Sequence, residues 1–163
     1  ELVPAKSAER VPSLTDSITT SSLRRRPRAE EQTAPVREAP RPHTPISVGD
    51  AATLRTDDMM VRLAGLSLPA PGAVCKRLDG LAVACADRAA AYLELLVKGR
   101  TVACDRLGKD TDGTDLGRCR IGETDIAEQM IRQGWASAAN AEDSRLTRAE
   151  AAARQQKLGI WRE

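Results

Sequence analysis

Apolar residues recur at intervals of three and four in three segments, which is the spacing of a helix with one buried face. The first segment is rich in Ala and Leu and carries Tyr92, the single tyrosine, on its apolar side. Residues that can cap a helix precede the second and third segments, and a glycine ends each of the three. The predicted helices are 86–99, 124–135 (capped by Thr124 or Asp125 and ended by Gly134) and 143–159 (capped near Asp143 or Ser144 and ended by Gly159).

Polar and apolar residues alternate along residues 46–66, which predicts strands rather than a helix. A second pair of strands flanks the loop GKDTDGTD at 108–115. This loop is rich in acids but has no acid at the twelfth position of a helix–loop–helix calcium motif, so we interpret it as a hairpin turn. Five short strands with one helix among them and two after them indicate an α+β fold, a small β-barrel carrying helices. The strands named by the pattern are 51–56, 59–66, 100–107 and 116–121, with a turn at Asp57-Asp58.

Neither pattern is present in residues 1–45, which hold seven of the nine prolines and none of the eleven glycines. Such a segment cannot bury enough apolar surface to offset the entropy of ordering it. We therefore predict a disordered Pro/Arg/Ser-rich arm or linker at 1–45 and a folded domain at 46–163. The net charge of +2 belongs to the arm, because the domain has seventeen basic and seventeen acidic residues. A neutral domain has no overall field that attracts polyanions.

The four cysteines permit three pairings, of which the local one joins Cys75 to Cys85 and Cys104 to Cys119. We favour these two disulfides, with free buried thiols as the alternative. A zinc site is disfavoured because the chain has no C-x-x-C motif and its one histidine, His43, falls in the predicted arm. Residues 75–85 themselves have the character of a loop.

Two disulfides would suit a periplasmic or secreted protein. No apolar stretch approaches the length of a membrane span. Because the chain begins with Glu1, an upstream signal or anchor stays open as an expectation.

Several strings resemble the staphylococcal nuclease (thermonuclease) family over about 46–163. The resemblance implies a five-stranded OB-fold β-barrel with three helices. It also implies calcium-assisted hydrolysis of a phosphodiester, with two aspartates on the calcium, a glutamate assisting the attacking water and two arginines on the phosphate. The strings are ATLR (52–55), VRLAGL (61–66), CDRLGK (104–109), MIRQGWA (130–136) and EAAARQQKLGIW (150–161).

The three acid positions that the resemblance implies are all lost in this chain. The calcium aspartates correspond to Ala52 and Ser67, and the glutamate corresponds to Ala70. These positions are vestigial, so we predict no catalytic residue and no metal ligand.

The phosphate arginines correspond to Arg62, which is retained, and to Lys109. Both are candidates for binding phosphate or another anion, although Arg62 could instead serve a structural ion pair, which we favour slightly. The aromatic positions that help to hold a nucleotide fall at Leu107 and near Asn140 and Glu142. We expect Tyr92 to pack in the core, and Trp135 and Trp161 to pack in the core or against helices.

The sequence therefore favours an exported, non-catalytic binding or structural domain with no cofactor. The alternative is a weak or rearranged calcium-dependent nuclease acting on DNA or RNA. The partner is open: an anionic polymer, either single-stranded nucleic acid or acidic polysaccharide, is one possibility. Similarly eroded sites occur in nuclease-like proteins associated with exopolysaccharide (succinoglycan) biosynthesis, which this chain resembles.

Overall fold

The structure, a computed structural model, describes residues 39–44 and 47–162. Most of the predicted arm lies outside this range. The second and third helices begin at the expected caps: the Asp125 carboxylate accepts a hydrogen bond from the Glu128 N–H at 3.1 Å, and the Asp143 carboxylate accepts one from the Arg145 N–H at 3.1 Å. The helices are α1 (Cys85–Val97), α2 (Ile126–Arg132), α3 (Ser144–Gln155) and the 3-10 helix η1 (Gly159–Trp161).

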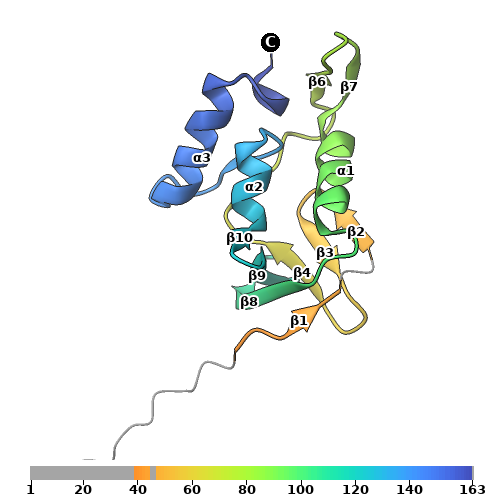
Figure 1. Ribbon diagram of the computed structural model, residues 1–163, viewed down its shortest axis with the longest axis vertical. Coiled ribbons are helices and arrows are strands. Elements are labelled where there is room, and N and C mark those ends of the chain that lie inside the picture. Colours follow the sequence, from red (N-terminus) through yellow and green to blue (C-terminus); the bar gives the residue numbers. More distant parts are fainter. Residues whose placement is uncertain (1–38, 45–46, 163) are drawn as a thin grey trace, which may run out of the picture. The chain divides into compact units, whose positions relative to one another are not determined.

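The main sheet is mixed and curls into a half-barrel, and with the three α-helices it makes an α+β fold (Figure 1). Neighbouring strands run in the order β1-β8-β9-β4-β3-β2, and they are antiparallel except for the parallel pair β4–β9. Five strands of this sheet have three or more residues, which is the number of strands that the sequence predicted. They are β2 (Ser47–Asp50), β3 (Thr53–Arg55), β4 (Met60–Leu63), β8 (Val102–Lys109) and β9 (Asp115–Ile121).

Two short strands extend this sheet. β10 (Thr124–Asp125) pairs with β9, and β1 (Pro42–His43) pairs with β8. The sheet thus begins inside the segment that we predicted as an arm. Pro42 is compatible with a strand here because β1 is at the end of the strand order, where a residue without an N–H is tolerated.

The core lies between the sheet and helices α1 and α2, and α3 packs against α2 (Figure 1). Tyr92 and Trp135 are partly buried against this core, as expected. Trp161 packs against α3, where the Arg154 guanidinium lies 3.8 Å from the centre of the Trp161 ring. The fully buried large side chains are Leu54, Val61, Leu93, Val102, Cys119, Ile126, Met130 and Ile131.

Residues 74–84 form a β-hairpin, and our prediction of a loop over 75–85 is therefore wrong. Strand β6 (Val74–Lys76) pairs with β7 (Ala82–Ala84) around a turn in which Gly80 has a φ of +80°. The alternation that normally indicates a strand cannot be recognised here because each strand has only three residues, of which one, Cys75 or Val83, is buried or partly buried. Leu78 at its tip is 92% exposed.

Both predicted disulfides are present. Cys75 is bonded to Cys85 at the base of the β6–β7 hairpin, and Cys104 is bonded to Cys119 across strands β8 and β9. Within the described residues, no helix is long and apolar enough to cross a membrane. The remaining strands, β5 (Leu66–Ser67) and β11 (Ser137–Ala138), form a separate two-stranded sheet.

Candidate functional site

Arg62 points from strand β4 into the turn between β8 and β9. Its Nη1 donates to the Asp110 carboxylate, and its Nη2 lies 3.1 Å from an Asp112 carboxylate oxygen. The hydrogen bond that Arg62 donates to Asp110 is the main reason why the pKa of Arg62 is raised. The pKa of Asp110 is lowered by the backbone N–H of Thr111 and then by Arg62. The structural ion pair that we favoured for Arg62 is therefore present, and two carboxylates occupy its donors.

Lys109, at the end of β8, is likewise paired with an acid of the same chain. Its ammonium group donates to the Asp115 carboxylate at 2.9 Å and to the Gly113 carbonyl at 3.2 Å. Arg106 approaches the other oxygen of the same carboxylate at 2.8 Å. The bond from Lys109 is the main reason why the pKa of Asp115 is lowered.

Sheet pairing brings some of the predicted positions together. Thr53 pairs with Arg62, and the Leu63 N–H donates to the Ala52 carbonyl at 2.7 Å, so Ala52 borders Arg62. Lys109 pairs with Asp115, which in turn pairs with Val61, the residue before Arg62. These three positions share one end of the sheet.

Ser67 and Ala70 do not belong to this sheet. Ser67 lies on β5 and pairs with Ser137, while Ala70 is exposed in the loop before β6. The sequence did not reveal that Asp110 and Asp112 would meet Arg62. Its only signal was a turn rich in aspartate, because the parallel pairing of β4 with β9 has no local signature.

A family model for staphylococcal nuclease homologues matches residues 60–163, well over half of the chain. The chain belongs to the staphylococcal nuclease family. The match contains Arg62, Ser67, Ala70 and Lys109, whereas Ala52 precedes it. Comparison with curated proteins finds no significant match.

The calcium ion of the nuclease family does not fit the residues present. The side chains of Ala52 and Ala70 have no ligating atom, and the Ser67 side chain offers one neutral hydroxyl. The Thr53 hydroxyl is buried and has no hydrogen-bond partner among the described residues, yet it too is a single neutral oxygen. Calcium takes about six to eight oxygen ligands, including carboxylates. The donor set of a nuclease calcium site is therefore absent from the described residues at these positions.

The one group of three metal-type side chains in the described residues lies elsewhere. His43, Asp57 and Asp58 come together at the turn between β3 and β4, with His43 Nδ1 3.2 Å from an Asp58 oxygen. Thr53, the strand partner of Arg62, is at the other end of this hairpin. These acids consequently do not replace the missing carboxylates beside Arg62.

The positions of the nucleotide-stacking residues border a cavity of about 320 Å³. Leu107 and Asn140 both line it, and none of its lining residues is aromatic. Its two cations are already paired: Arg145 contacts Asp125 at 3.1 Å, and Arg118 lies 3.8 Å from the same carboxylate. This cavity offers a nucleotide neither a stacking surface nor an unpaired positive charge.

Proposed function

We propose that this protein is an exported, non-catalytic binding or structural domain built on the nuclease fold. The observation that carries the proposal is the pairing of Arg62 with Asp110 and Asp112 at a site whose three acid positions are alanine or serine. In a phosphodiesterase, the arginine donors must be available to charge that develops on the phosphate. Here they already bind carboxylates of the same chain.

The metal chemistry points the same way. A calcium ion would have to polarise the phosphoryl oxygen and help to generate the nucleophile, and both roles need a ligand set that this site lacks. Removing one charge-stabilising group in an active site costs about 3–4 kcal/mol of transition-state stabilisation. The loss of three acids removes both the metal site and the base, so residual calcium-dependent hydrolysis is not expected.

Export is supported by the two disulfides, because disulfides persist in oxidising compartments outside the cytoplasm. We assign the protein to the periplasm or the extracellular space. An anionic ligand suits the fold, since OB-type barrels commonly bind anionic chains. Single-stranded nucleic acid is disfavoured because only 2% of the residues are aromatic and base stacking needs aromatic faces. An acidic polysaccharide, in the setting of exopolysaccharide biosynthesis, is the better match.

The test is a cleavage assay on single-stranded DNA and RNA with millimolar calcium. We expect no cleavage by the natural chain and no calcium-induced rise in its melting temperature. A second experiment uses a variant that combines Ala52→Asp, Ser67→Asp and Ala70→Glu with Asp110→Asn and Asp112→Asn. The first three changes restore the acids, and the last two release Arg62. This variant should gain calcium-dependent stabilisation. Calcium-dependent cleavage by the natural chain that disappears in Arg62→Ala would overturn the proposal.

A further inference from the structure

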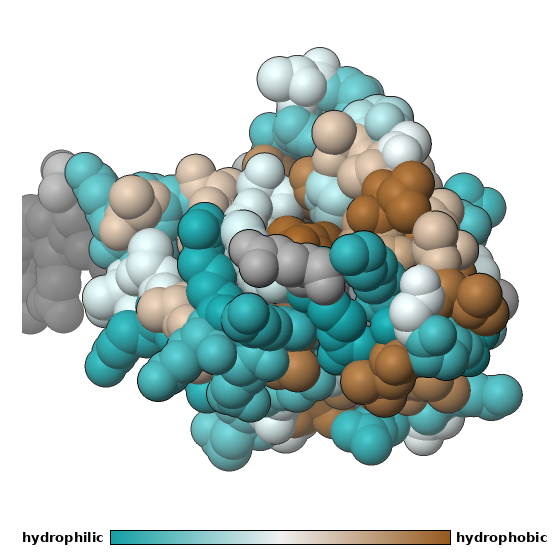
Figure 2. Space-filling view, turned by 90° about the horizontal axis from the view of Figure 1, so that it is seen from above, coloured by the Kyte–Doolittle hydropathy of each residue, from teal (hydrophilic) through white to brown (hydrophobic). Residues whose placement is uncertain are grey.

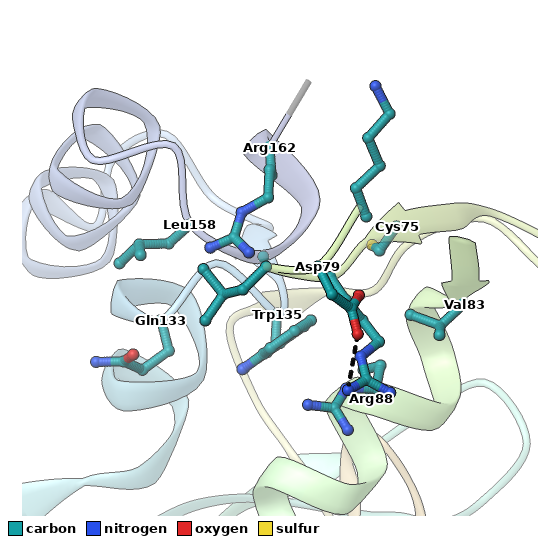
Figure 3. A pocket seen from close by; sticks show the side chains of 12 residues that line it. Cys75, Asp79, Val83, Arg88, Gln133, Trp135, Leu158 and Arg162 are labelled. Carbon is teal, nitrogen blue, oxygen red and sulfur yellow. Dashed lines mark ion pairs between the residues drawn. The ribbon is translucent and has the colours of Figure 1, made fainter. Parts of the chain in front are cut away.

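A second cavity, of about 420 Å³, lies outside the family's catalytic site. It is bounded by the β6–β7 hairpin, the first turn of α1, the end of α2 and the segment around η1. Figure 3 shows Trp135 within it, with Arg162 reaching in from the C-terminal segment and Arg88 from α1. None of the residues that line it is an acid position or a phosphate position of the nuclease site.

Positive charge is concentrated around this cavity. Among the described residues, four cations and one acid line it, and the acid, Asp79, is paired with Arg77 at 3.2 Å. Within the described ranges, the side chains of Lys76, Arg88 and Arg162 have neither an ion pair nor a hydrogen bond. This is the reverse of the vestigial nuclease site, where the cations are held by carboxylates. Unpaired positive charge is thus available here and not there.

An apolar floor accompanies these cations. Trp135 is partly buried against the core. Its backbone N–H donates to the Met130 carbonyl at 2.9 Å, which holds this residue at the end of α2. Leu158 and Val83 add apolar surface around it. On the face seen in Figure 2, hydrophilic side chains lie beside small separate groups of hydrophobic ones. An aromatic ring beside unpaired cations can bind a flat apolar face and an anionic group together.

The walls of the cavity are held in place without a ligand. The Cys75–Cys85 disulfide ties the hairpin to the start of α1. On the other side, the Ile160 N–H donates to the Gly134 carbonyl at 2.7 Å, which fixes η1 against the end of α2. A cavity that is formed in advance loses less entropy on binding.

We propose that this cavity binds a small ligand that carries a carboxylate or phosphate beside an apolar ring face. The guanidinium groups of Arg88 and Arg162 present planar sets of donors that match either anion, and Trp135 receives the ring. Both a sugar acid and a mononucleotide have this chemistry. The proposal rests on the function proposed above and gives it a binding site and a ligand class.

The experiment titrates the full chain with glucuronate, with AMP and with neutral glucose, followed by calorimetry and by the NMR signal of the Trp135 indole. We expect at least one anion to bind and glucose to bind at least about tenfold more weakly. The anion that binds more tightly shows whether the site prefers the carboxylate of a sugar acid or the phosphate of a mononucleotide. Absence of binding by both anions at millimolar concentration would overturn the proposal.

Variants locate the site. The double variant Arg88→Gln/Arg162→Gln should lose at least about tenfold in affinity. Its melting temperature should be unchanged, because neither side chain has a partner in the described residues. Lys98→Gln, at the opposite end of α1 and outside the cavity lining, is the matched control and should bind normally. Undiminished binding by the double variant, or an equal loss in Lys98→Gln, would contradict the assignment. Cleavage assays on the same samples test the loss of catalysis separately.

Discussion

The two disulfides close loops of similar length, but one closes an exposed hairpin and the other joins two strands of the main sheet. Their cysteines are separated by 10 and 15 residues. In the chain-entropy description, cross-links of these lengths stabilise the folded state by about 2.7 and about 3 kcal/mol. Replacing each pair by alanine should therefore cost almost the same, if restriction of the unfolded chain were the whole effect.

The surroundings of the two bonds make the outcomes different. Every residue from Lys76 to Ala82 is exposed, and an isolated two-stranded hairpin is at best marginally stable in water. Without Cys75–Cys85 this hairpin can open locally while the rest of the domain stays folded. Cys119 is fully buried within the main sheet, so the sheet cannot relax in the same way.

We therefore expect Cys104→Ala/Cys119→Ala to lose about 3 kcal/mol or more in urea unfolding, and Cys75→Ala/Cys85→Ala to lose less than about 2.7 kcal/mol. Hydrogen exchange of the Arg77 amide, which donates to the Leu81 carbonyl, should become fast only in the second variant. If that amide keeps its protection without the disulfide, the hairpin is stable by itself and this reasoning is wrong.

Two further predictions concern the end of α2 and the acidic turn. Gly134 has a φ of +75°, and a Cβ there would collide with the Leu158 carbonyl, so Gly134→Ala should cost about 3–5 kcal/mol in urea unfolding. Gly122→Ala, at φ +57° with open space around it, should cost only about 1–2 kcal/mol, and equal losses would contradict the clash. The pKa values of Asp110 and Asp112 are lowered from 3.8, so their stabilisation is present above pH 3.8 and is lost as the pH falls below it. When melting temperatures are measured on both sides of this pH, they should fall less steeply with decreasing pH in Asp110→Asn/Asp112→Asn than in the natural chain. Parallel curves for the two proteins would refute the assignment.

Local patterns in the sequence predicted the three helices, the caps of α2 and α3 and the glycine at the end of α2, because each depends on residues within one or two turns. The predicted end of α3 at Gly159 is wrong, since α3 ends at Gln155 and Gly159 begins η1. The disulfides were predictable for the same reason, since each joins cysteines at the ends of a short segment. The β6–β7 hairpin was missed because each strand has only three residues, of which one is buried or partly buried, too few for an alternation of apolar residues to be recognised. The strand at Pro42–His43 was missed because its composition is that of the preceding segment.

The candidate site was predictable only by residue type. Ala52, Ser67 and Ala70 have no carboxylate, and the resemblance to the family predicts that each stands where an acid is lost. The pairing of Arg62 with Asp110 joins residues 48 positions apart, and its geometry depends on the register of β4 against β9. The cationic cavity is less predictable still, because its lining comes from four separate elements whose packing no local pattern specifies.

The composition of that cavity also has a consequence for the order in which its walls form. One wall is a hairpin whose cysteines are 10 residues apart, so closing it requires little loop entropy and can happen as a local event. The opposite wall consists of the segments around Gln133 and Gly159, which must dock on each other and then against the hairpin over a long sequence separation. We expect an oxidised hairpin to precede the docked C-terminal segment during refolding, which would make the cavity one of the last features of the domain to mature.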